Sequence, residues 1–147
     1  MKPRTRARSV ALQALYEIDI IGHPPGQVLE DRFADAELDE ALCEFARQIV
    51  LGILPVVQKL DGLIASHAPE WPLDQVAAID RNILRIALWE IILEGKTPIK
   101  VAINEAVELA KVFGSDSTPR FVNGVLGSLV LHHNEIIQAF QRSTPQE

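Results

Sequence analysis

Apolar side chains recur along most of this 147-residue chain at intervals of three and four, which is the spacing of one helix face. No segment alternates apolar and polar residues as a half-buried strand requires. The first periodic segment, about 3–21, starts with a proline in its first turn and ends before Gly22. The pattern predicts an all-α protein, a compact bundle of about six or seven helices.

Prolines and glycines divide the rest of the chain into further helices. A short segment around QVLEDRFAD precedes a long helical stretch, about 38–66, in which Pro55 should produce a kink. The run IDRNILRIALWEIILEG is apolar on nearly every side, which predicts a central, buried helix. Two more helices are predicted, over 98–114 and 118–140, the last with Thr118 as its cap. The tail 141–147 is predicted to be frayed.

Hydrophobic residues make up 48% of the chain, enough for a globular core. The 14 Lys and Arg residues are outnumbered by 20 Asp and Glu, so the net charge is −6. The first eight residues nevertheless contain Lys2, Arg4, Arg6 and Arg8 and no acid. Because a local field acts within about 10 Å at ordinary salt, this basic tip can bind an anion although the whole chain is acidic.

Cations in the first turn of a helix oppose the helix dipole at about 0.3–1 kcal/mol each. The phosphates of a nucleic acid would compensate them and would also accept hydrogen bonds from the free N–H groups of the helix start. The alternative is a solvated and partly disordered basic end.

A polar and aromatic stripe continues below the basic tip. At about 100° per residue, Thr5, Ser9, Gln13 and Tyr16 fall beside the core face of the first helix. Single-stranded RNA is bound by stacking on aromatic rings and by hydrogen bonds to exposed base edges, so Gln13 and Tyr16 favour RNA. The alternative for Tyr16 is a half-buried core residue with its hydroxyl in water.

Arg120 and Phe121 repeat the combination of a cation and an aromatic ring in the first turn of the last predicted helix. A second anion site is possible there, and core packing is the alternative for Phe121. Gly124 and Gly127 in the same helix predict the close approach of a neighbouring helix.

Several charged residues fall in otherwise apolar helices. Asp80 is placed to cap the central helix, and Arg81 and Arg85 are expected to form ion pairs with neighbouring carboxylates. Glu105 lies at the edge of an apolar arc, where a carboxylate needs a partner. Arg85 is the partner that we suggest for it.

Motifs for catalysis are not found. The sequence contains no glycine-rich phosphate loop, nucleophile elbow or HExxH motif, and its four histidines have no Cys or acidic cluster at metal-ligand spacing. The lone Cys43 fits a reducing compartment, and acids interrupt the apolar residues that follow the basic start. We therefore expect a cytoplasmic protein that is not an enzyme, holds no metal or cofactor and has no membrane association.

Three segments resemble the NusB family of bacterial transcription antitermination factors: RARSVALQALYEIDI, IDRNILRIALWEI and PIKVAINEAVELAKVFGSDSTPRFVNGVL. The resemblance spans nearly the whole chain, although 22–72 matches mainly in its helical pattern. It implies an all-helical fold of two packed subdomains, about 1–70 and about 71–140, with no catalytic activity.

The resemblance also implies a function and a set of site residues. The family binds boxA, a short single-stranded element of ribosomal RNA leader transcripts, jointly with NusE, a small-subunit ribosomal protein. The pair joins other Nus factors on RNA polymerase and suppresses premature termination. Carried over by position, the RNA-binding residues are Lys2, Arg4, Arg6, Arg8, Gln13, Tyr16, Arg120 and Phe121, and the NusE-facing residues are Asp80 and Arg81.

Two other functions stay open at this point. The basic end could meet an acidic protein surface, which would make the chain a helical protein-interaction module without direct RNA binding. The same helical domain is also known fused to ribosomal RNA methyltransferases. Those enzymes need a further domain with a glycine-rich cofactor loop, and no such loop occurs in this sequence.

Overall fold

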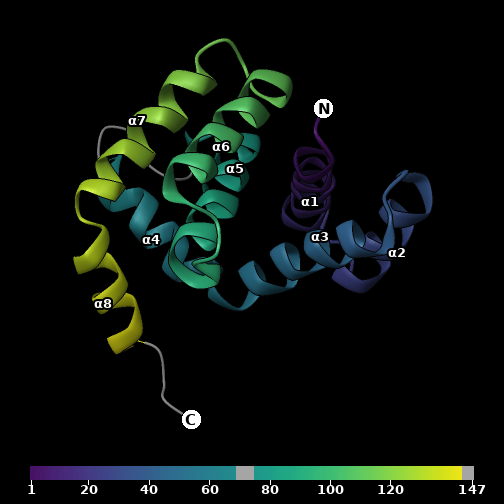
Figure 1. Cartoon of the computed structure of the whole chain (residues 1–147), viewed down its shortest axis with the longest axis horizontal. Helices are drawn as coiled ribbons and strands as arrows, with labels where there is room; N and C mark the ends of the chain where they lie inside the picture. The colour runs from purple at the N-terminus through teal and green to yellow at the C-terminus, as the bar shows by residue number, and fades with distance from the viewer. Residues whose placement is uncertain (69–74, 144–147) are drawn as a thin grey trace.

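The computed structural model describes residues 1–68 and 75–143, and no strand occurs in these two ranges, which confirms the all-α prediction (Figure 1). The elements are α1 (Pro3–Ile20), α2 (Pro25–Asp35), α3 (Glu40–Ile53), the 3-10 turn η1 (Leu54–Val56), α4 (Val57–His67), α5 (Ala78–Leu88), the π-helical turn η3 (Trp89–Glu94), α6 (Ile99–Phe113), α7 (Thr118–Leu131) and α8 (His133–Ser143). The predicted subdomain boundary near residue 70 lies outside the described residues and stays a prediction.

The long helical stretch predicted over 38–66 is interrupted at η1, as expected. Pro55 lies in η1 and has no N–H for the helical ladder, so α3 ends and α4 restarts at a different angle. Asp39 caps α3, because its carboxylate accepts a hydrogen bond from the Leu42 N–H at 2.9 Å. By length and hydropathy alone, Glu40–His67 could cross a membrane, but here Ile49 and Leu60 are fully buried in the protein core.

The prediction of one final helix over 118–140 is wrong. The chain bends at His132, whose φ of −115° and ψ of 24° separate α7 from α8. The bend brings Ile136 and Phe140 onto the core, where each is only 8% exposed. The helix then continues to Ser143. The remaining residues of the tail predicted to be frayed lie outside the described residues, and that prediction stays untested.

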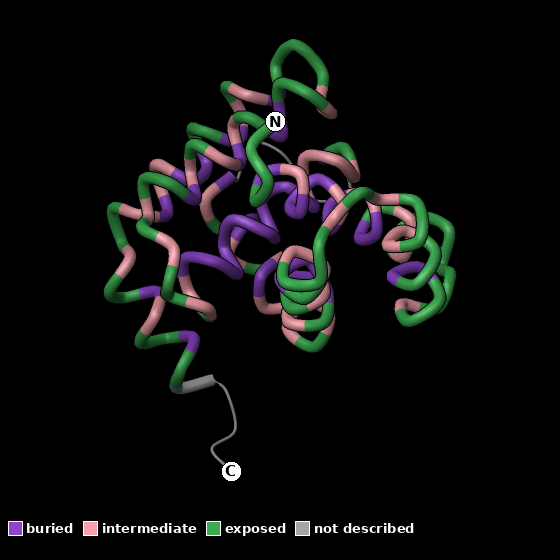
Figure 2. Tube along the Cα trace, turned by 45° about the vertical axis from the view of Figure 1, so that its right-hand side comes forward, coloured by how far each residue is buried: buried purple, intermediate pink, exposed green. Residues whose placement is uncertain are grey.

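The central position predicted for α5 is confirmed. Residues 82–91 are all buried, and α5 packs against α1, α4, α6 and α7 (Figure 2). One hydrophobic cluster includes side chains from all of these helices and from α3. In Figure 1, α1, α2 and α3 lie on one side of the molecule, and α6, α7 and α8 lie on the other. The start of α1 nevertheless contacts α6, because Thr5 donates a hydrogen bond to Glu105.

Gly52 is the glycine at which two helices approach closely. A Cβ added there would lie 2.3 Å from Nε1 of Trp89, so the indole packs directly on the backbone of α3. The prediction for Gly124 and Gly127 is wrong, because a Cβ at either position would meet no atom within 4 Å. These two glycines face open space rather than a neighbouring helix.

Two buried charges join α1 to the central helix. Arg8, 3% exposed, donates from Nε and Nη2 to the carboxylate of Glu90, 1% exposed, at 2.7–3.2 Å. Glu90 also accepts a hydrogen bond from Thr97 at 3.1 Å. Glu105 of α6 lies 3.6 Å from Nη1 of Arg8 and accepts a hydrogen bond from Thr5 at 2.7 Å. This network fixes the rotation of α1 about its own axis.

The suggested pairing of Glu105 with Arg85 is wrong. Arg85 instead binds both carboxylate oxygens of Asp61 at 2.7 Å and lies 3.2 Å from Asp19. Burial alone would lower the pKa of Arg85, but these two carboxylates raise it above its ordinary value. The two side chains do not meet because they point to different parts of the fold. Arg85 faces α4 and the end of α1, whereas Glu105 faces the start of α1. The expectation that Arg81 and Arg85 form ion pairs is confirmed, because Arg81 contacts Asp19 at 2.8 Å.

The buried pair predicts a strong coupling between Arg8 and Glu90. We expect Arg8→Met and Glu90→Met each to lower the free energy of unfolding by about 3–5 kcal/mol, because each strands one buried charge. The double variant should lose less than the sum of the two by about 1–3 kcal/mol. Urea unfolding followed by circular dichroism measures all four proteins, and strictly additive losses would contradict the pairing.

Candidate RNA and partner interface

Three cations at the start of α1 have no carboxylate partner among the described residues. Lys2 and Arg4 are exposed, and Arg6 is half-buried. The guanidinium of Arg4 lies 3.9 Å above the ring of Phe45, and Arg6 donates to the backbone carbonyl of Glu37. No acid stands in the first turn of α1. The positive charge therefore adds to that of the free N–H groups at this helix end.

Arg8 does not belong to this exposed set, and its assignment as an RNA-binding residue stays a prediction that its burial argues against. Its guanidinium is inside the fold, where it binds Glu90. Reaching a phosphate would break that pair at about 3–5 kcal/mol. Arg8 instead orients the helix that carries the exposed cations. Glu90, a lone acid within the apolar run ALWEII, was the sequence signal for this role.

The polar stripe predicted below the tip is shorter in the structure. Thr5 and Ser9 are each 7% exposed and form hydrogen bonds inside the fold. Gln13 is half-buried, and Tyr16 is 37% exposed. The part of the stripe that reaches solvent is therefore Gln13 with Tyr16.

Arg32 of α2 joins this stripe, and the sequence reasoning missed it. Its Nη1 donates to Oε1 of Gln13 at 2.9 Å, and its Nη2 donates to Oε1 of Glu17 at 3.1 Å. His23 contacts the other carboxylate oxygen of Glu17 at 2.9 Å. The His23 and Arg32 contacts hold the pKa of Glu17 below its usual range, against the effect of desolvation. No spacing rule brings Arg32 to Gln13, because the contact depends on how α2 folds back on α1.

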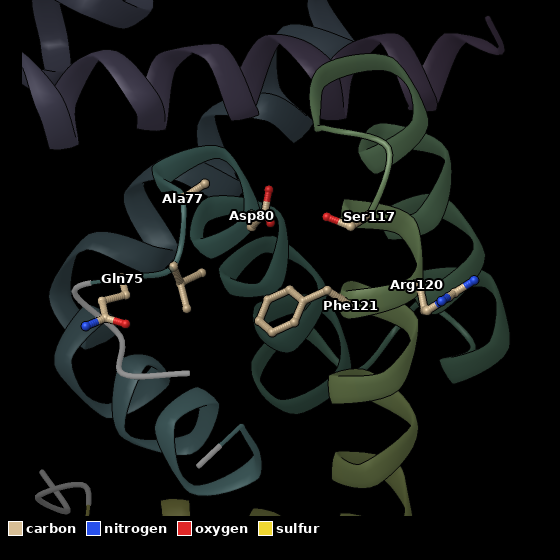
Figure 3. A pocket seen from close by; sticks show the side chains of 7 residues that line it. Gln75, Ala77, Asp80, Ser117, Arg120 and Phe121 are labelled. Carbon is tan, nitrogen blue, oxygen red and sulfur yellow. The ribbon is translucent and has the colours of Figure 1, made fainter. Parts of the chain in front are cut away.

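Arg120 and Phe121 lie at a cleft of about 390 Å³ between the start of α5 and the start of α7. Figure 3 shows the ring of Phe121 pointing toward α5 and the side chain of Arg120 pointing outward from α7. Asp80 and Ser117 line the same cleft. The ring of Phe121 also packs against the core cluster, so it has one apolar side and one side in the cleft.

Asp80 connects the two helix starts instead of capping α5. The cap residue of α5 is Ala77, and Asp80 stands in the first turn. The carboxylate of Asp80 accepts a hydrogen bond from Oγ1 of Thr118 at 3.0 Å, and that oxygen accepts one from the Ser115 N–H at 2.9 Å. Thr118 thus lies inside α7, after the cap residue Ser117, and ties the α6–α7 loop to α5. Burial raises the pKa of Asp80, and the Thr118 hydrogen bond opposes this shift.

The two residues assigned to the protein partner, Asp80 and Arg81, are both half-buried and bonded within the fold. Nε of Arg81 is a buried donor without a hydrogen-bond partner in the described part of the chain. Their role toward a partner stays a prediction. Across residues 1–68 and 75–143, no group of three or more His, Cys, Asp or Glu side chains is placed to hold a metal ion.

The structure is that of an all-α protein with a cationic helix start, an exposed Tyr16 further along the same helix, and a cleft lined by a cation and an aromatic ring. The chain belongs to the NusB family, whose model matches residues 5–130. The transcription antitermination protein NusB of Roseiflexus castenholzii is 47% identical over 134 residues, covering 90% of this chain and 94% of that protein. The NusB of Chloroflexus aggregans is 48% identical over 132 residues, with 88% of each chain covered.

Solved structures agree with this family assignment. T. maritima NusB superposes with a TM-score of 0.82 at 33% identity, covering 94% of this chain and 99% of that one. A second similar structure is a crystal structure of the antitermination factors NusB and NusE in complex with double-stranded RNA. Its matching chain has a TM-score of 0.78 at 25% identity and covers 95% of this chain and 98% of that one.

The raised pKa of Asp80 predicts how its charge affects stability with pH. In the folded state the carboxyl binds its proton more readily than in the unfolded state, so the charge of Asp80 destabilises the fold at neutral pH. We expect Asp80→Asn, which keeps an acceptor for Thr118, to unfold at a higher temperature than the wild type at pH 7. The difference should vanish below pH of about 3.9, where Asp80 is protonated in both states.

Thermal unfolding at both pH values checks this, with the exposed Asp116→Asn as the control. A lower unfolding temperature for Asp80→Asn at pH 7 would show that the charge of Asp80 stabilises the fold.

Proposed function

We propose that this chain is a transcription antitermination factor that binds single-stranded, boxA-type RNA of ribosomal RNA leader transcripts jointly with NusE. The observation that carries the proposal is the set of three uncompensated cations, Lys2, Arg4 and Arg6, on a chain of net charge −6. The antitermination proteins to which the chain is 47% and 48% identical support the biological role.

The RNA backbone follows the start of α1 in this proposal. The three cations and the free N–H groups of the first turn bind phosphates, and Tyr16 stacks one base. Phe121 and Arg120 receive a further nucleotide at the cleft beside α5. The solved NusB and NusE complex contains double-stranded RNA. The exposed ring of Tyr16 favours a single strand, because bases in a duplex are already stacked on each other.

The protein partner in this proposal is NusE, bound where Asp80 and Arg81 lie at the start of α5. Other Nus factors and RNA polymerase are reached indirectly, through the complex that the two proteins form. The chain acts by binding and not by catalysis, and it acts in the cytoplasm, where bacterial transcription takes place. The alternative of an interaction module without RNA contact is tested by the experiments that follow.

Removing the cations of the basic tip should weaken the salt dependence of RNA binding by a predictable amount. We expect the triple variant Lys2→Gln, Arg4→Gln, Arg6→Gln to lower the log–log salt slope of RNA binding by about 2, at about 0.7 per phosphate contact on a single strand. Arg8 is kept so that the buried pair with Glu90 remains. Fluorescence anisotropy with a short boxA-type RNA at several salt concentrations, with and without NusE, gives the slopes.

The matched control replaces Lys59, Lys96 and Lys100 with Gln, which removes the same charge from residues outside the N-terminal basic segment. This control should leave the slope nearly unchanged. If both triple variants reduce the slope equally, RNA responds only to net charge and the proposed site is wrong. If the wild type binds NusE tightly but no RNA in any combination, the interaction-module alternative holds.

Variants of Tyr16 test whether the proposed site binds single-stranded or duplex RNA. We expect Tyr16→Ala to weaken binding of single-stranded RNA by about 1–3 kcal/mol, the usual contribution of one stacked base, and to leave duplex binding unchanged. Tyr16→Phe keeps the ring and should bind like the wild type. An equal loss on single-stranded and duplex RNA would contradict a stacking role.

A further inference from the structure

The side-chain amide of Gln13 has a fixed orientation. A guanidinium contains only hydrogen-bond donors, so the Gln13 atom that lies 2.9 Å from Nη1 of Arg32 must be the carbonyl oxygen, Oε1. The amide nitrogen Nε2 then lies on the side of the amide away from Arg32. The contact with Arg32 is the one hydrogen bond that the Gln13 side chain forms with the described residues, so Nε2 has no partner among them.

Arg32 is itself held in place from its other side. Nη2 binds Glu17 at 3.1 Å, and Glu17 is bound in turn by His23 at 2.9 Å. The planar guanidinium therefore spans two acceptors, Gln13 and Glu17, that lie one helical turn apart on α1. A lysine ammonium lacks this fork and cannot hold both acceptors in the same way.

Gln13 stands one helical turn before Tyr16 on α1. Side chains three residues apart on a helix are neighbours, with about 5–6 Å between their Cβ atoms. Tyr16 is 37% exposed, and Gln13 is half-buried beside it. A base that stacks on the Tyr16 ring therefore brings a polar edge within reach of the Gln13 amide.

We propose that Arg32 is a positioning residue for base recognition: it turns Gln13 so that the amide donates, which selects a base with a carbonyl at the contacted edge. Guanine O6 and uracil O4 accept such a hydrogen bond, whereas the amino groups of adenine and cytosine do not. This inference rests on the proposed RNA-binding function. It means that Arg32 and Gln13 together discriminate, at the nucleotide beside Tyr16, between bases with a carbonyl and bases with an amino group at the contacted edge.

The test compares base preferences rather than overall affinities. A short single-stranded RNA is changed one position at a time, uridine to cytidine or guanosine to adenosine, and binding is measured by anisotropy. The wild type should show one position at which the carbonyl base binds about 2- to 10-fold better, the range for one hydrogen bond. Arg32→Lys keeps the charge and should reduce that ratio to about 1 with the salt slope unchanged.

Arg47→Lys is the matched control, because Arg47 is a half-buried arginine of α3 that pairs with Glu44 and does not contact Gln13. It should keep the wild-type ratio. Gln13→Glu is the second test variant. A carboxylate still binds Arg32 but only accepts hydrogen bonds, so the preference at the same position should shift toward the amino base.

Two results would overturn the inference. The first is a wild-type base preference that Arg32→Lys and Gln13→Glu both leave unchanged. The second is a fall in salt slope of about 0.7 for Arg32→Gln with the base ratio unchanged, which would mean that Arg32 binds a phosphate directly. In either case RNA binding itself remains, so the proposed function stands. A wild type that binds no RNA, alone or with NusE, would instead contradict the proposed function.

Discussion

The buried ion pair of Arg8 and Glu90 is the interaction on which the rest of the surface depends. Two charges at 3% and 1% exposure are stable only while their hydrogen bonds are intact, because removing an ion from water costs several kcal/mol. Helix α1 therefore cannot turn or slide against η3 without leaving both charges unpaired. Since α1 carries the three cations of the tip as well as Gln13 and Tyr16, this pair sets the position of the whole proposed RNA surface.

The cost of burying an unpaired charge also explains where the charged side chains lie in this structure. Within the fold the arginines are matched by carboxylates: Arg8 by Glu90, and Arg85 by Asp61 and Asp19. At the start of α1 the cations are matched by a ring face and a backbone carbonyl, which leave their charge in place. In the proposed function, an RNA that is repelled by most of this acidic chain is attracted at one helix end. The proposed location of the site follows from the lack of carboxylate partners for Lys2, Arg4 and Arg6 among the described residues rather than from an excess of bases overall.

Helical periodicity, Pro55 and the apolar run around residues 82–91 were sufficient to predict the fold class, the kink between α3 and α4 and the central helix. They could not separate Arg8 from Arg4 and Arg6, because that distinction depends on which side of α1 meets α6 and η3. Glu90 gave a partial signal, since an acid within an apolar run needs a partner. The bend at His132 had no proline or glycine to mark it, and the contact of Arg32 with Gln13 depends on the packing of α2. Long-range packing, which a local pattern does not contain, decided each of these points.

The Nε–H signal of Arg8 tests the central claim most directly. It can be followed in ¹H–¹⁵N spectra of the protein with and without a short single-stranded RNA. The account predicts a signal that is protected from solvent exchange and unchanged by RNA, while the signals of Arg4 and Arg6 shift. An Arg8 signal that exchanges rapidly in the free protein, or that shifts together with those of Arg4 and Arg6, would mean that Arg8 leaves Glu90 to bind RNA, and would contradict it.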